Sequence, residues 1–214
     1  MRVISIPTEP TRLTAPALRD AVSSLREQVQ EAHRVLEERL AEVTSEQSDG
    51  SLPGWSQRLG AYAHALCVED GTIHALLKGD APLFATTWAD QVQWGPPPPR
   101  FERGDQAWIR RVEGELSALR RYATAVFAAT DLYLASLTPE GLVRTVDLSG
   151  RGLGQPTVAW VVSRCLLGEL TSACSALSVV KRRAGAAETP TSAASSYPPF
   201  RADPSPRTRC GLLA

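Results

Sequence analysis

Apolar residues recur at spacings of three and four along the first part of the chain. Charged residues such as Arg19, Glu27 and Glu38 occupy positions between them. This pattern predicts an amphipathic helix of about seven turns. The helix begins after Thr14-Ala15-Pro16, where Thr14 can cap it, and ends at residues 47–50. Its apolar stripe consists of Leu18, Val22, Leu25, Val29, Ala32, Leu36, Leu40 and Val43.

Three further helices are predicted in the same way. The second covers residues 55–78, with Ser56 as its N-cap and Gly79 as its C-terminal stop. The third covers residues 105–136. The fourth covers residues 156–183 and is apolar around much of its circumference, which indicates a position inside a helical bundle.

The connection between the second and third predicted helices, residues 80–104, shows no helical period. Long loops in compact domains are usually functional or disordered. The aromatic content of this loop favours one that packs onto the helices, and we expect it to cover the site as a lid. Its aromatic residues surround a run of four prolines and are Phe84, Trp88, Trp94 and Phe101.

A shorter connection separates the third and fourth predicted helices. Residues 138–141 indicate a break, residues 142–148 an extended piece, and residues 149–154 a glycine-rich turn. Nucleotide binding is not expected at this turn, because no Lys-Ser/Thr pair of the phosphate-binding type follows the glycines.

These elements predict an all-α fold, a four-helix bundle with a long, aromatic-rich crossover loop. The bundle domain should occupy residues 12–183. The composition then changes to Ala, Ser, Thr and Pro, so residues 184–214 are expected to form a disordered tail.

Composition narrows the classes of function. The chain has 214 residues, 43% of them hydrophobic, which suffices for one domain with a sizeable core. Its 23 basic and 23 acidic side chains give a formal net charge of zero. No long-range field of one sign should therefore draw it to nucleic acid or to an anionic membrane. The basic residues are 21 Arg and two Lys, a bias typical of a high-GC, actinobacterial coding background.

Location can also be predicted. No stretch approaches the run of about 20 apolar residues that spans a bilayer. Pro7 interrupts the N-terminal segment too early for a secretory signal. The four Cys show no CxxC spacing and indicate small core residues or free thiols rather than disulfides. We therefore expect a cytoplasmic protein.

The chain contains only three histidines: His33, His64 and His74. The last two are ten residues apart, roughly 280° around a helix at about 100° per residue, so they should not face one site. The chain has no HExxH motif and no paired Cys/His spacing. A metal site is therefore not evident from spacing alone.

Two short motifs nevertheless resemble a known family. Pro53-Gly54-Trp55-Ser56 opens a helix that continues through Ala63-His64-Ala65 to Glu69, and this resembles helix two of the DinB-like superfamily. That group includes mycothiol-dependent maleylpyruvate isomerases and related thiol transferases. The resemblance covers about residues 15–183. It implies a four-helix bundle with a long crossover and a divalent metal held by three His, one of them at the position of His64.

The chain departs from the family at the other two ligands, which the resemblance places on the last helix. Gly168 and Ser172 stand where those His would be, and Glu169 matches the Glu of the family motif. One imidazole does not hold a divalent metal that normally has three such ligands. We therefore expect no metal and no other cofactor.

Small residues in place of the imidazoles leave two alternatives open. Gly168, Ser172 and Ser175 share one face of the predicted fourth helix. That face either makes a close helix–helix contact or lines a cavity in the bundle. For the cavity, we expect His64 and Glu169 to be catalytic. The expected substrate-binding residues are Glu69, Trp88, Trp94, Trp108, Tyr122, Gly168, Ser172 and Ser175.

Three functions follow as hypotheses. The first is a metal-free isomerase, cyclase or group-transfer enzyme of bacterial, including secondary, metabolism, in which His64 moves protons for a small organic substrate. The second is a non-catalytic small-molecule binding or resistance protein. The third is a metal- and thiol-dependent transferase that takes its missing ligands from His33 or Glu169. The expected partner is a small molecule, and a homodimer remains open.

Overall fold

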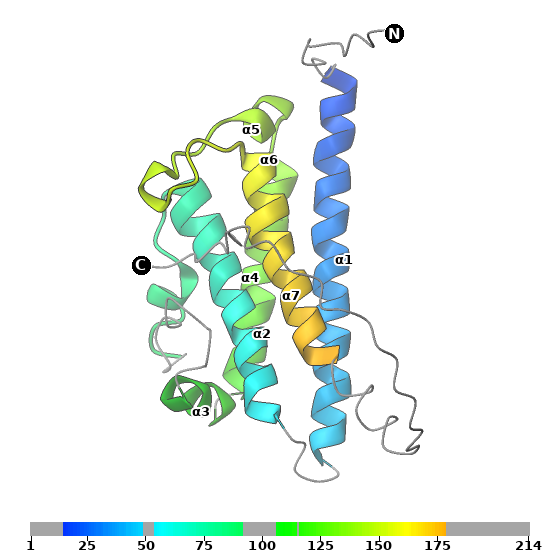
Figure 1. Ribbon diagram of the computed structural model, residues 1–214, viewed down its shortest axis with the longest axis vertical. Helices are drawn as coiled ribbons and strands as arrows, with labels where there is room; N and C mark the ends of the chain where they lie inside the picture. Colours follow the sequence, from blue (N-terminus) through cyan, green and yellow to red (C-terminus); the bar gives the residue numbers. More distant parts are fainter. Residues whose placement is uncertain (1–14, 49–53, 92–105, 115, 179–214) are drawn as a thin grey trace, which may run out of the picture.

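The computed structural model describes residues 15–48, 54–91, 106–114 and 116–178, and this part of the chain is all-α, as predicted (Figure 1). Its longest helices lie side by side: α1 (Ala15–Ser48), α2 (Trp55–Asp70), α4 (Leu116–Ser136) and α7 (Leu167–Ser178). No strand occurs among these residues. None of the described helices combines the length and apolar composition needed to cross a membrane.

The core lies between the four long helices. Both α1 and α2 pack against α4 and α7, so each helix has neighbours on two sides. Every one of the four contributes fully buried residues, for example Leu36, Leu66, Leu119 and Leu170. Burial of each such side chain stabilises the fold by about 1.5–3 kcal/mol before entropy is counted. The apolar stripes predicted from the sequence are therefore what joins these helices.

The second predicted helix is confirmed in extent but not in its cap. Gly54, in a left-handed conformation with φ of 79°, precedes the first turn. The Ser56 hydroxyl donates a hydrogen bond to Glu113 of α3 (Gln106–Gly114) over 3.0 Å and caps nothing. Beyond Asp70 the helix widens into a π-helical segment, η1 (Gly71–Lys78). It ends at Gly79, as predicted, where φ is 76°.

The prediction of one continuous helix over residues 105–136 is wrong. The structure has two helices, α3 and α4, and α3 lies across one end of the molecule at a steep angle to α4 (Figure 1). Glycine at the end of α3 is a poor helix former, which favours an interruption there. The change of direction buries Trp108 and Val112 of α3 in the core, and α3 packs against α2.

The extended piece predicted for residues 142–148 is confirmed over 144–148, where the amides of Val146 and Leu148 donate to the carbonyls of Pro156 and Gly154. The prediction starts too early. Its first residues belong to a short helix, α5 (Pro139–Val143), which has proline in its first turn. The Thr138 hydroxyl caps it by accepting a hydrogen bond from the Gly141 amide (3.1 Å). The β-type pairing is a single bridge between Thr145 and Thr157. A threonine cap followed by proline specifies a helix start, and that local signal outweighs the apolar run.

The last predicted helix begins where expected, with Thr157 as its N-cap. It consists of three consecutive parts: α6 (Val158–Val161), a second π-helical segment, η4 (Val162–Leu166), and α7. The two π-helical segments contact each other. Some predictions fall outside the described residues: the end of this helix at residue 183, the tail over 184–214, and Trp94, Phe101 and the prolines of the crossover loop.

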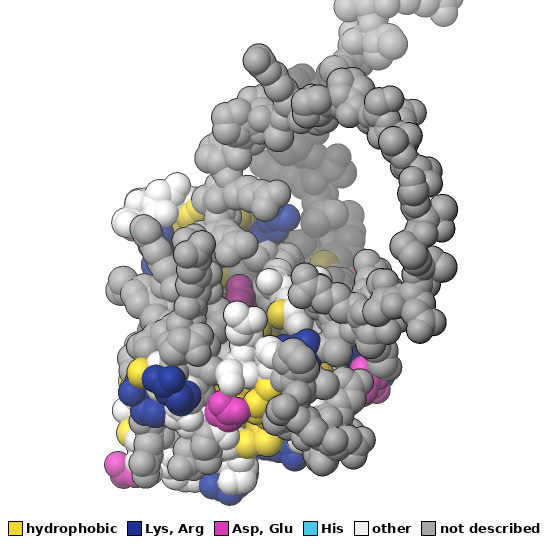
Figure 2. All heavy atoms as spheres, turned by 60° about the horizontal axis from the view of Figure 1, so that its bottom comes forward, with side chains coloured by type: hydrophobic (Ala, Val, Ile, Leu, Met, Phe, Trp, Pro, Cys, Tyr) yellow, Lys and Arg dark blue, Asp and Glu magenta, His cyan; other side chains and the backbone are white. Residues whose placement is uncertain are grey.

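Figure 2 shows the end of the molecule where α3 lies. On the described surface of this face, basic and acidic side chains are interspersed with apolar ones.

One buried hydroxyl in η1 generates a stability prediction. Thr72 is fully buried, and within the described residues its hydroxyl has no hydrogen-bond partner. Thr72→Val replaces that hydroxyl with a methyl group of nearly the same size. We expect the free energy of unfolding to rise by about 1 kcal/mol in chemical denaturation, because an unsatisfied polar group is removed from the core.

Thr130→Val is the matched control for this change. The Thr130 hydroxyl is equally buried but donates a hydrogen bond to Glu69 (2.5 Å). The same substitution there should lower the free energy of unfolding by about 1–3 kcal/mol. Destabilisation by both variants would contradict the assignment of Thr72 as unsatisfied.

Candidate functional site

Each of the three histidines lies against a carboxylate. His33 of α1 pairs with Glu69, His64 of α2 with Glu169, and His74 of η1 with Asp70. A carboxylate fixes the orientation of an imidazole and stabilises its protonated form. The three pairs differ in burial, and this decides what each of them can do.

The pair His64–Glu169 joins the two residues that the sequence analysis expected to be catalytic. Nδ1 of His64 lies 2.9 Å from Oε1 of Glu169, although the residues are 105 positions apart. Helices α2 and α7 pack against each other and bring them together. The two side chains are 16% and 29% exposed, so solvent reaches this pair. The carboxylate can orient the imidazole ring and stabilise its protonated form.

The small residues of α7 lie differently from what the sequence suggested. Gly168, Ser172 and Ser175 are exposed, so the expectation that they face the interior is wrong. The inward face of α7 is made by Leu170, Ala173 and Leu177 instead. The larger apolar side chains gain more from burial than glycine or serine, and this rotates the small residues outward. The carboxylate of Glu169 consequently meets His64 near the surface.

Three other residues expected to bind substrate are buried in the core. Trp108 and Tyr122 have almost no exposed surface. Glu69 is 1% exposed and points to His33, whose Nε2 lies 2.9 and 3.0 Å from the two carboxylate oxygens. The hydroxyl of Thr130 donates to the same carboxylate, and the His33 ring stacks on Phe127 at 3.9 Å. These contacts tie α2 to α1 and α4 and do not involve His64.

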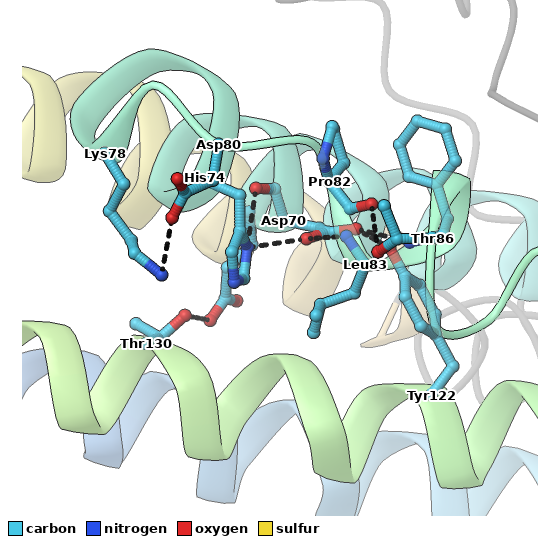
Figure 3. A network of polar contacts seen from close by, with 11 residues as sticks. Asp70, His74, Lys78, Asp80, Pro82, Leu83, Thr86, Tyr122 and Thr130 are labelled. Carbon is cyan, nitrogen blue, oxygen red and sulfur yellow. Dashed lines mark hydrogen bonds and ion pairs between the residues drawn. The ribbon is translucent and has the colours of Figure 1, made fainter.

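Asp70 is the centre of a second buried network (Figure 3). It has no exposed surface, and each carboxylate oxygen has two neighbours. Oδ1 accepts from the Leu83 amide (2.9 Å) and lies 2.8 Å from Nδ1 of His74. Oδ2 accepts from the Phe84 amide (3.0 Å) and from the Tyr122 hydroxyl (2.7 Å). Four neighbours match the four lone-pair positions of an ionised carboxylate.

The first part of the crossover loop lies against this network. The segment contains a short 3₁₀ turn, η2 (Leu83–Ala85). Trp88 is half-buried, and its ring meets that of Tyr122 edge-on, with centroids 5.9 Å apart. Trp88 therefore packs on a residue of the Asp70 network, since the Tyr122 hydroxyl donates to Asp70. Trp94 lies outside the described residues.

Asp70, which is the partner of His74, and Thr130 were not predicted from the sequence. A signal was present, because Glu69 and Asp70 stand together inside the mostly apolar run from Ala63 to Leu77. A carboxylate in a buried helix needs hydrogen-bond donors, so two in succession predict partners on two sides. Which partners they find depends on how the helices pack.

The donor groups of the described residues do not form a metal site. No three of their His, Cys, Asp or Glu side chains come together as metal ligands. His64 and Glu169 supply two donors, and His33 is engaged by Glu69. Catalytic zinc normally has three protein ligands, so the described donors around His64 do not fit the metal site that the DinB-like resemblance implies.

The cysteines of the described residues do not mark a reactive thiol. Cys67 and Cys165 are buried, as expected of small core residues. Burial raises the pKa of the Cys174 thiol above its ordinary value, which disfavours the nucleophilic thiolate.

Two buried tyrosines generate a prediction about pH. Burial, together with Glu37 for Tyr62 and with Cys67 and Asp70 for Tyr122, raises the pKa of both phenols well above the ordinary value of 10. The folded state therefore holds these protons more tightly than the unfolded chain does. Stability should be fully present below about pH 10 and fall as the pH rises above it.

This loss is measured by chemical denaturation at a series of pH values between about 8 and 12. Tyr122→Phe removes one of the two phenols, so the variant should lose less stability over the same interval than the unmodified protein. Tyrosinate absorbance should show that neither phenol ionises near pH 10 while the chain stays folded. Ionisation of all tyrosines at the ordinary pKa without loss of stability would contradict the burial of these hydroxyls.

The outward position of Gly168 generates a second prediction. A Cβ built on Gly168 meets no heavy atom within 4 Å. Gly168→Ala should raise the free energy of unfolding by about 0.5–1 kcal/mol, because glycine is the less favourable residue inside a helix.

Gly152→Ala is the matched control for Gly168→Ala. A Cβ at Gly152 would also meet nothing within 4 Å, but the φ of this residue is 72°. The substitution should therefore destabilise the protein by about 1–2 kcal/mol through backbone strain alone. If Gly168→Ala destabilised the protein as Gly152→Ala does, the open position of Gly168 on α7 would be refuted.

The chain matches no family model, and no curated protein or solved structure is significantly similar to it. Its function is therefore inferred from its own side chains. Among the residues that the structure describes, the partly exposed pair of His64 and Glu169 is the arrangement best suited to chemistry on a ligand.

Proposed function

We propose that the chain is a metal-free isomerase, cyclase or group-transfer enzyme that acts on a small organic molecule through His64 and Glu169. The single observation that carries this is the 2.9 Å contact between Nδ1 of His64 and Glu169 at a partly solvent-accessible position between α2 and α7. A base that must reach a substrate needs such access, whereas the carboxylate–imidazole pairs of His33 and His74 are buried.

The proposed fold is a DinB-like four-helix bundle built from α1, α2, α4 and α7. The mutual packing of these helices and the place of His64 on the second of them support it. In this proposal the chain keeps the scaffold of the family. The acid–base pair stands in place of the metal.

The mechanism follows from the geometry of the pair. In this proposal His64 takes a proton from the substrate, and the carboxylate of Glu169 stabilises the imidazolium that forms. In an isomerisation, His64 returns the proton to a different atom of the same molecule. In a cyclisation or transfer, the proton comes from the attacking hydroxyl, thiol or amine and is delivered to the leaving group. In each case the base is regenerated and no net proton is lost.

A non-catalytic binding protein is the second candidate function. The His64–Glu169 contact also joins α2 to α7. This contact would fit a protein in which the pair binds a ligand through polar contacts and moves no proton. The two candidates differ in whether the pair moves a proton, so the experiment must detect proton transfer itself.

Ligands are first identified by ligand-observed NMR with a library of small hydroxy, keto and thiol compounds. Bound compounds are then incubated with the protein in D₂O, and incorporation of deuterium at carbon is followed by mass spectrometry. His64→Ala should slow incorporation by about 10²–10⁴-fold while the compound still binds, since that is the usual contribution of a general base. Glu169→Gln should slow it by at least about tenfold, because the imidazolium loses its counter-charge.

Ser163→Ala is the control variant, since Ser163 is an exposed residue of η4 outside the proposed site. Its deuterium incorporation should equal that of the unmodified protein. Unchanged incorporation in His64→Ala would exclude His64 as the base. Tight binding by the unmodified protein with neither deuterium incorporation nor a new product in the mass spectrum would favour the binding protein.

A further inference from the structure

We propose that residues 82–91, here called the strap, form one unit that a single carboxylate, that of Asp70, holds against the helices. The strap opens around Gly79 while the helices stay folded. Opening would bring the buried group of Asp70, His74 and Tyr122 into contact with solvent (Figure 3). The strap would thus control access to a second group of ionisable residues, separate from His64 and Glu169.

The strap is attached to the helices by hydrogen bonds to one residue, Asp70, and these bonds are here called the latch. The amides of Leu83 and Phe84 donate to the two oxygens of Asp70, at 2.9 and 3.0 Å. They are the first amides of the turn η2, which have no partner within the turn itself. Among the described residues, these are the hydrogen bonds that connect the strap to the helices.

The remaining backbone hydrogen bonds of the strap are internal. Ala85 donates to Pro82, both Thr86 and Trp88 donate to Leu83, and Gln91 donates to Trp88. A segment whose other bonds are its own can move without breaking them. It therefore behaves as one unit in an opening reaction.

The packing of the strap is weak compared with that of the helices. Leu83, Phe84 and Trp88 are only half-buried, and the residues between them are exposed. Tyr122 beneath Trp88 is fully buried, as is Asp70. Segments with few buried contacts open with a smaller free energy than the core they cover. Loss of the strap contacts is thus far less costly than loss of the helix packing.

The hinge lies at the end of η1. Gly79 has a φ of 76°, and a Cβ there would meet no atom within 4 Å. The amides of Gly79 and Asp80 donate to the His74 carbonyl, so movement of the strap begins beyond these two hydrogen bonds. The ion pair between Lys78 and Asp80 (3.1 Å) spans the hinge. Both of its side chains are exposed, so the pair contributes little to holding the strap.

The experiment is native-state hydrogen exchange of the full chain, followed by NMR at several low denaturant concentrations. The amides of Leu83 and Phe84 should exchange through an opening that depends weakly on denaturant, and faster than the core amides Leu66 and Val126. Exchange of Leu83 and Phe84 only by global unfolding, at the rate of Leu66 and Val126, would overturn the proposal.

Asp70→Asn tests the latch. Asn keeps one accepting oxygen and replaces the other with a donating NH2 group, so the amides of Leu83 and Phe84 no longer both have an acceptor. Exchange at Leu83 and Phe84 should accelerate by about tenfold or more relative to Val126. Equal acceleration at all these amides would show that Asp70 holds the whole fold rather than the strap. Asp80→Asn, the same change at an exposed residue near the hinge, should leave the ratio unchanged.

Trp88→Ala provides a test that leaves Asp70 intact, in case Asp70→Asn does not fold. It removes the contact between the strap and Tyr122 and should also accelerate exchange at Leu83 and Phe84 while Leu66 and Val126 keep their rates. No change at Leu83 and Phe84 in this variant would contradict the view that the strap is held by Asp70 and by this packing.

Discussion

Two consecutive carboxylates inside the core, Glu69 and Asp70, are the constraint on which much of this structure depends. A buried carboxylate without donors would cost several kcal/mol, so each must be fully hydrogen-bonded. Consecutive residues of a helix point about 100° apart. Glu69 accordingly turns to α1 and α4, whereas Asp70 turns to Tyr122, His74 and the strap. The two requirements together set the rotation of α2 against all its neighbours.

The same constraint separates the histidines into two kinds. His33 and His74 pair with the buried carboxylates of Glu69 and Asp70, and each histidine supplies its carboxylate with a polar partner. His64 lies on another side of α2, where Glu169 of α7 meets it at the surface. A protein with three carboxylate–imidazole pairs thus presents, among its described residues, one that a ligand can approach. This difference in burial is the physical basis for proposing acid–base chemistry at His64 and not at the buried networks around Glu69 and Asp70.

Most helices were predictable from the sequence, because an apolar stripe at helical spacing extends over many residues and agrees with their helix propensity. Prediction failed where a local feature changed the chain direction: the interruption before Leu116 and the threonine cap with proline that begins α5. His64 and Glu169 were named together as catalytic residues from the DinB-like resemblance, and their side chains lie 2.9 Å apart. Gly168, Ser172 and Ser175 were placed on the wrong side, because three small residues on one face do not reveal which face is buried.

By itself, the sequence determined the all-α character, the starts of α1, α2 and the last helical segment, and the presence of two acids in a mostly apolar segment. Each of these depends on local spacing and residue type. Only the tertiary structure decided the partners of those acids, the outward rotation of the small residues of α7, and the attachment of the strap through Asp70. These depend on which side chains from distant segments meet. An acidic residue in an apolar segment predicts that a polar partner is needed, but only the packing of the helices decides which residue that partner is.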